Sequence, residues 1–143
     1  MLTKIIEQIV ENNEVYTLED QNGIAVSQSL LFQMEDGSPV PVICFWSDKE
    51  KAKKCCVEDW AKYRVTAICL ATFIEDWLVQ IYNDSFIVGF DFSNEMKGIE
   101  ADPLDTILLL VNQLKKQKIE LELEYFKDLK DLENQTKGLM KKA

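Results

Sequence analysis

Residues 38–54, SPVPVICFWSDKEKAKK, decide the fold of this chain. An apolar run that ends on Trp46 is followed directly by S-x-x-E, from Ser47 to Glu50. This order predicts a strand that leads straight into a helix over residues 48–63. We expect a capping box, in which the Ser47 hydroxyl accepts the Glu50 N–H and the Glu50 carboxylate accepts the Ser47 N–H.

Periodic patterns on either side of this stretch predict further strands and helices. An amphipathic helix over residues 4–11 and a hairpin within residues 15–27 precede it. A second S/T-x-x-E box, at residues 72–75, begins another helix with an apolar stripe. Asp102 and Pro103 supply an N-cap and a first-turn proline for a last helix. We therefore predict an α+β fold with a single, small, mostly antiparallel sheet and three or four helices.

The last part of the chain fits two secondary structures. Residues 119–125 alternate apolar side chains with glutamate, which is a strand pattern. A roughly seven-residue spacing of apolar side chains fits a helix equally well, at Val111, Leu114, Leu121, Tyr125 and Leu132. Strong helix formers favour one long helix over residues 104–134. Such a helix would protrude, so we expect it to form a homo-oligomer interface. The chain divides into an α+β domain, 1–118, and a helical extension, 119–143.

The charge of the chain limits its partners. The sequence has 143 residues, with 25 acidic and 16 basic side chains and a net charge of −9, and Arg64 is its one arginine. A negative field and a lack of arginine are unsuited to nucleic acid and favour a protein partner that is basic. No apolar run approaches the roughly 20 residues that span a bilayer. The N-terminus does not have the pattern of a signal peptide. We expect no membrane contact and a cytoplasmic location.

The composition also restricts catalysis. The chain has no histidine, so it lacks the base of Ser-His and Cys-His nucleophile systems. Its four cysteines, at positions 44, 55, 56 and 69, form no C-x-x-C pair and fit structural thiols. Single glycines form no phosphate-binding loop. We expect no metal, no cofactor and no enzymatic activity, and paired carboxylates remain the alternative for an enzyme that acts on a small molecule.

Four short motifs resemble one bacterial family. They are V-Y-T-L-x-D-x-x-G at 15–23, P-x-x-x-F-W-S at 41–47, L-x-x-F-x-x-x-W-L at 70–78 and D-x-x-x-x-G at 84–89. Together they resemble the domain of unknown function 2750 family, over about residues 3–115. More distantly, the strand that runs through F-W-S into a helix is similar to the N-terminal domain of SseB-like proteins. The resemblance implies a small cytosolic α+β domain, found in settings compatible with toxin immunity or secretion, and no reaction.

Two surfaces are candidates for partner binding. At the strand-to-helix junction, Trp46, Ser47 and Asp48 surround helix N–H groups that favour an anion. An ordinary helix cap explains the same residues. A second, acidic edge suits a lysine-rich partner, or is simply a solvated rim. Its members are Asp91, Asn94, Glu95, Glu100 and Asp102.

These observations favour a non-enzymatic protein-binding module. Its sharpest form is an immunity or inhibitor protein that occupies the basic site of a toxin. One alternative is a homo-oligomeric accessory protein, of the secretion or chaperone kind, that assembles through its C-terminal helix. The other is the enzyme with paired carboxylates.

Overall fold

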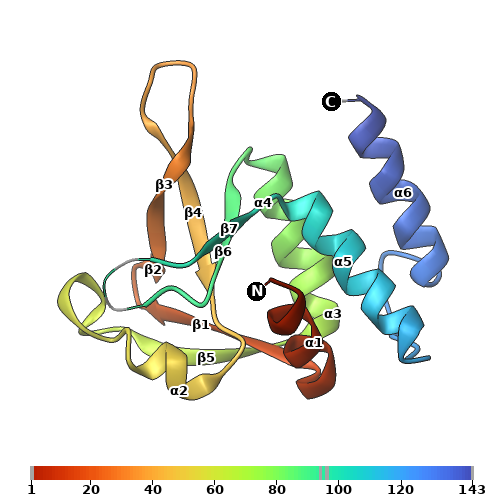
Figure 1. The fold of residues 1–143 in the computed structure, drawn as a ribbon, viewed down its shortest axis with the longest axis horizontal. Helices are drawn as coiled ribbons and strands as arrows, with labels where there is room; N and C mark the ends of the chain where they lie inside the picture. The colour runs from red at the N-terminus through yellow and green to blue at the C-terminus, as the bar shows by residue number, and fades with distance from the viewer. Residues whose placement is uncertain (1, 94, 96, 143) are drawn as a thin grey trace.

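The computed structural model describes residues 2–93, 95 and 97–142, and it confirms the α+β class (Figure 1). The strands form two sheets rather than the single sheet that we expected. In the first sheet, β1 (Glu14–Asp20) lies between two antiparallel neighbours, β2 (Gly23–Ile24) and β5 (Arg64–Cys69). The second sheet has the order β3 (Val26–Gln33), β4 (Pro39–Phe45), β6 (Ile87–Phe90) and β7 (Ile99–Ala101). Within it, β4 and β6 are parallel, and the other neighbours are antiparallel.

Ala25 is the point at which the chain changes sheets. Its N–H donates to the Leu18 carbonyl at 2.8 Å, and its carbonyl accepts the Cys44 N–H at 3.1 Å. The segment therefore pairs with β1 before Ala25 and with β4 after it. The two sheets meet again where Tyr16 and Trp46 exchange backbone hydrogen bonds of 2.9 and 2.7 Å. The single-sheet prediction is wrong because this strand divides its pairing between two neighbours.

Helices cover one side of the sheets and enclose the main core (Figure 1). They are α1 (Leu2–Asn12), the continuous stretch α3 (Leu70–Thr72), η2 (Phe73–Leu78) and α4 (Val79–Asn83), and α5 (Pro103–Lys116). The η2 segment is π-helical. A smaller apolar cluster surrounds Trp46 and includes Trp60 and Phe92. None of the described helices combines the length and the apolar character that a bilayer span requires.

The helix expected over residues 48–63 is much shorter. It is α2 (Lys49–Lys53), and a separate 3-10 helix, η1 (Glu58–Trp60), follows it. In a continuous helix, Cys55 and Trp60 would point about 140° apart, so they could not enter the same core. The break after Lys53 allows both side chains to be buried, at 2% and 5% exposure.

The second expected capping box does not form. The helix begins at Leu70, so Thr72 lies inside its first turn and Cys69 takes the N-cap position. Glu75 is buried and accepts the backbone N–H groups of Glu124 and Tyr125, at 3.0 and 2.8 Å. The glutamate expected to cap its own helix therefore fastens the C-terminal part of the chain instead.

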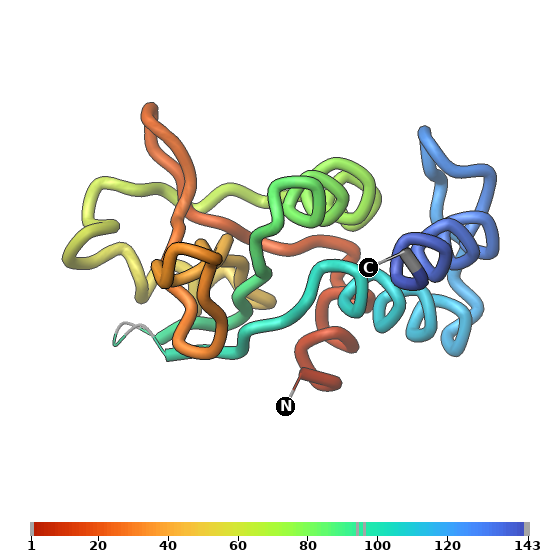
Figure 2. The backbone as a smooth tube through the Cα atoms, turned by 90° about the horizontal axis from the view of Figure 1, so that it is seen from above, coloured from red at the N-terminus to blue at the C-terminus, as the bar shows by residue number. Residues whose placement is uncertain are grey.

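The expected long C-terminal helix is two helices. The first, α5, ends at Lys116, and Lys118 takes a left-handed backbone conformation (φ 56°) that stops it. The chain resumes as α6 (Leu129–Lys142), which packs along α5 at the end of the molecule far from β3 (Figure 2). Leu114 and Leu132 are fully buried in the main core. The helix does not protrude, so the basis on which we expected self-association is wrong, and self-association itself stays a prediction.

Candidate functional site

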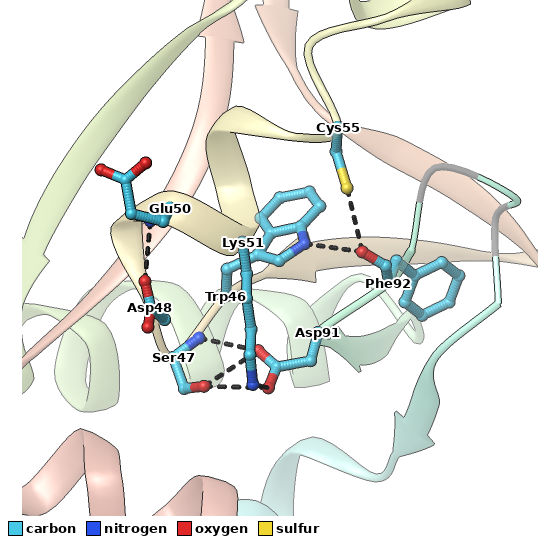
Figure 3. A network of polar contacts seen from close by, with 8 residues as sticks. All are labelled: Trp46, Ser47, Asp48, Glu50, Lys51, Cys55, Asp91 and Phe92. Atoms are coloured by element: carbon cyan, nitrogen blue, oxygen red, sulfur yellow. Dashed lines mark hydrogen bonds and ion pairs between the residues drawn. The ribbon is translucent and has the colours of Figure 1, made fainter.

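The strand-to-helix junction after β4 is built around a shared carbonyl (Figure 3). The Phe92 carbonyl accepts the Trp46 indole N–H at 2.8 Å and the Cys55 thiol at 3.0 Å. Trp46 is fully buried, and its ring meets that of Trp60 edge-on, with 5.8 Å between centroids. Trp46 is therefore a core side chain whose polar atom is satisfied internally, and it presents no surface to a partner.

Ser47 makes a different contact from the one that the capping box predicts. Its N–H donates to Asp91 Oδ1 at 2.8 Å, and its hydroxyl lies 3.0 and 2.9 Å from the two Asp91 oxygens. Asp48 is the N-cap of α2 and accepts the Glu50 N–H at 2.7 Å. The expected capping box is wrong because the Ser47 N–H donates to Asp91, which follows the end of β6, and not to Glu50. Two of the N–H groups at this junction, those of Ser47 and Glu50, therefore already have carboxylate partners.

Asp91 fastens this junction to the second sheet. Its side chain is 12% exposed, and Lys51 Nζ lies 3.2 Å from its Oδ2 (Figure 3). Asp91 has φ 53°, a left-handed conformation that aspartate tolerates better than most residues. Its contacts to Ser47 and Lys51 offset the cost of that conformation, which is of order 1 kcal/mol. Asp91 is thus a positioning residue for the junction.

The thiols near this junction are structural. Burial raises the pKa of the Cys44 thiol to about 12 and also raises that of Cys55. Both thiols are therefore protonated and unreactive at neutral pH. Cys69 differs, because it is exposed, and the Thr72 hydroxyl bonded to it lowers its pKa. Across the part of the chain that the structure describes, no three potential ligand side chains gather where a metal ion could be held.

Three members of the acidic edge are engaged in hydrogen bonds within the fold. Asp102 caps α5, as the sequence predicts, by accepting the N–H groups of the two residues after Pro103 at 2.8 and 3.0 Å. Asp91 is engaged at the junction, and Glu100 bonds to β3. Glu95 is exposed, and Asn94 lies outside the described residues. Three of the expected docking carboxylates are therefore occupied with holding the fold together.

The arm formed by β3, β4 and their connecting turn is the surface that sequence reasoning missed. It projects beyond the rest of the molecule (Figure 1). Three adjacent side chains near its end, which we call the apolar knuckle, are exposed: Leu30 by 82%, Leu31 by 71% and Phe32 by 52%. The sequence already indicates exposed apolar side chains here. Successive side chains of a strand point to opposite faces, so three consecutive apolar residues cannot all face the core.

The knuckle lies on a bulge that polar contacts hold in place. The β3–β4 register shifts between the Gln28–Pro41 and Gln33–Pro39 pairs, so residues 29–32 lie opposite Val40 alone. The Ser29 hydroxyl accepts the N–H groups of Leu31 and Phe32 at 3.1 and 2.8 Å. That hydroxyl donates to Glu100 Oε1 at 2.5 Å, and Glu100 Oε2 accepts the Leu30 N–H at 2.9 Å. Glu100 and Ser29 therefore fix the backbone that displays the knuckle.

Comparison with known proteins adds a family and no function. A family model described as "Protein of unknown function (DUF2750)" matches residues 2–110, which include both sheets and the first part of α5. No curated protein and no solved structure matches the chain. The more distant resemblance to SseB-like N-terminal domains stays a prediction.

Proposed function

We propose that this chain, which belongs to the DUF2750 family of proteins of unknown function, is a non-enzymatic protein-binding module that contacts its partner through the β3–β4 arm. The apolar knuckle is the observation that supports this function. Contiguous exposed apolar side chains usually mark an interaction surface, because leaving them in water gains nothing for the fold. The β3 strand also lies at the edge of its sheet, where exposed apolar residues invite unwanted pairing.

The arm has the rigidity that a binding element needs. Ordering a flexible loop on binding costs conformational entropy, and a loop that is already ordered avoids that cost. Here, Ser29 and Glu100 satisfy the backbone N–H groups of all three knuckle residues. The turn is also closed, because Asp36 accepts the Ser38 N–H at 2.9 Å. These contacts support a preformed surface rather than a frayed hairpin.

The charge around the knuckle supports a cationic partner. Glu35 and Asp36 are exposed in the turn beside it, and the whole chain carries −9. The partner that best complements this arm has an apolar groove with lysine or arginine at its rim. The sharpest form of the proposal is an immunity or inhibitor protein, whose arm occupies the basic site of a toxin. Salt should then weaken the complex.

The experiment compares affinity capture from the native cytosol by three baits, at low and high salt. The baits are the wild type, a Leu30→Ser/Leu31→Ser variant, and Val57→Ser, which removes an exposed apolar side chain elsewhere. We expect one basic partner on the wild type and on Val57→Ser, released by salt and missing from the knuckle variant. Denaturant unfolding should show the knuckle variant within about 0.5 kcal/mol of wild type. Partner capture that does not depend on the knuckle would refute the proposal.

A further inference from the structure

A cleft of about 740 Å³ lies between α1, the end of β6 and β7. Its apolar lining is Ile5, Phe90 and Ile99, and its charged lining is Lys4, Lys51, Lys97 and Asp91. Ile99 is half-buried and supplies most of the exposed apolar lining, while the nearly buried Ile5 and the fully buried Phe90 hold that lining in place. The volume is within the range of roughly 300–1,000 Å³ that is usual for small-molecule sites.

The charge of the cleft is opposite to that of the chain. The protein has 25 acidic and 16 basic side chains, yet three lysines meet at this one cleft. Lys51 is paired with Asp91, while Lys4 and Lys97 form no ion pair with any residue that the structure describes. The charged side chains that line the cleft are three lysines and one aspartate, so its net charge is positive and favours an anionic ligand.

The walls of the cleft are held in position by tight packing. A Cβ atom on Gly98 would clash with the Phe92 ring and would lie 2.7 Å from the Phe90 carbonyl oxygen, so the β6 and β7 backbones approach closely here. On the opposite wall, the bonds from Asp91 to Ser47 and Lys51 fix the start of α2 (Figure 3). The cleft is therefore preformed and does not need a ligand to open it.

We propose that this cleft binds a small organic anion with an apolar body, of the class of medium-chain or aryl carboxylates. The hydrocarbon part lies on Ile99 and on the exposed edge of Ile5, which removes apolar surface from water. The carboxylate lies among the ammonium groups of Lys4, Lys51 and Lys97 at the rim. This site is separate from the arm, and it would add ligand binding to a protein-binding module.

The test titrates the ¹⁵N-labelled full chain with octanoate, and in parallel with the uncharged 1-octanol, and follows the backbone amide signals. We expect octanoate to produce saturable shifts around Ile5, Gln8 and Ile99, with octanol at least tenfold weaker. Lys4→Gln and Lys97→Gln should each weaken octanoate about threefold. Gln8→Glu, which adds an anion at the cleft without changing its shape, should weaken it as well. Lys62→Gln, an exposed lysine away from the cleft, should have no effect.

Three outcomes would overturn the small-anion proposal. Equal affinity for octanoate and octanol, or shifts confined to the knuckle, would show adhesion to exposed apolar surface only. No saturable shift up to millimolar octanoate would show that the cleft takes no such anion. The cleft could instead be occupied by the acidic β3–β4 arm of a second copy of the chain. Sedimentation of the free protein tests this, because such binding would produce a dimer. A concentration-dependent dimer that both Lys97→Gln and the Leu30→Ser/Leu31→Ser change abolish would assign the cleft to that arm and would refute the small-anion proposal.

Discussion

The C-terminal extension and the β3–β4 arm each have a backbone anchored by a distant glutamate, yet the extension packs against the main core and the arm does not. In the extension, Glu75 accepts the N–H groups of Glu124 and Tyr125. In the arm, Glu100 accepts the Leu30 N–H and the Ser29 hydroxyl. Each carboxylate therefore binds a backbone segment that is distant from it along the chain.

The two segments differ in what lies beneath them. The extension rests on α4 and α5, so Leu132 is fully buried and Phe126 is packed against the main core. The arm projects past the sheets, so Leu30 is 82% exposed (Figure 1). The same kind of carboxylate anchor therefore stabilises packing against the core in the extension and holds exposed side chains in place in the arm. Changes in the extension should reduce the free energy of unfolding, while changes in the arm should mainly affect binding.

The largest effect is expected at the anchor of the extension. Glu75→Gln replaces one acceptor oxygen by an NH₂ group, which faces a backbone N–H and leaves it without a partner. We expect a loss of about 1.5–3 kcal/mol in the free energy of unfolding, measured with urea, because a charge-assisted hydrogen bond to the buried Glu75 carboxylate is lost. Amide exchange in residues 119–128 should rise.

Glu122→Gln is the matched control, since it makes the same chemical change at an exposed position within the extension that Glu75 anchors. Its unfolding free energy should stay within about 0.5 kcal/mol of wild type. If the two variants behave alike, Glu75 does not anchor the extension, and the contrast with the arm fails.

A smaller effect on stability is expected at the anchor of the arm. Glu100→Gln should cost about 1 kcal/mol, because Glu100 is only half-buried and water can replace part of its bonding. Hydrogen exchange should accelerate at Leu30, Leu31 and Phe32 and remain unchanged in α6. Partner affinity should fall although the knuckle side chains are intact, because the surface must be ordered on binding.

Glu35→Gln is the control for the arm, since it removes an exposed charge in the turn without touching the Ser29 hydroxyl. It should leave exchange in the knuckle unchanged. Faster exchange in both variants would mean that the charge of the arm, and not the Glu100 anchor, keeps it ordered.

Local sequence patterns predicted the elements whose cause is local. The strand β1, the strand β4 before the junction and the Asp102 cap of α5 all follow from residues within a few positions of one another. The partition into two sheets does not, since it depends on Ala25 bonding to both Leu18 and Cys44. Long-range pairing of this kind has no signature in a single stretch of sequence.

The contacts predicted around the candidate sites are wrong for a related reason, while partner binding there stays a prediction. The S-x-x-E pattern at Ser47 is typical of a capping box. In the structure, however, the Ser47 N–H donates to Asp91, which lies 44 positions away in the sequence. The sequence patterns assign Glu75 to a capping box and Glu100 to an acidic docking edge, whereas their partners in the structure lie about 50 and 70 positions away. The knuckle is the exception, because three consecutive apolar residues before a turn already conflict with a half-buried hairpin.

The smallest effect concerns an ion pair that the extension has and the arm lacks among the described residues. Lys115 on α5 lies 2.6 Å from Glu133 Oε1 on α6, and Lys137 lies 3.7 Å from Oε2. The hydrogen bond from Lys115 lowers the pKa of the Glu133 carboxyl from its usual 4.5. A carboxyl whose pKa is lower in the folded state adds stability above its unfolded pKa and loses it as the pH falls through the folded value.

Acidification below about pH 4.5 should therefore loosen α6 through protonation of Glu133. The measurement is the amide protection factor of α6 at several pH values, in the wild type and in Glu133→Gln. The glutamine variant should show slightly lower protection near neutral pH and a flatter dependence below it, with the two proteins converging in acid. Protection in the knuckle should be the same in both proteins at every pH, because Glu133 does not contact the arm. A difference that persisted in acid would mean that Glu133 holds α6 by packing rather than by its charge, and the extension would then depend on Glu75 and its apolar contacts alone.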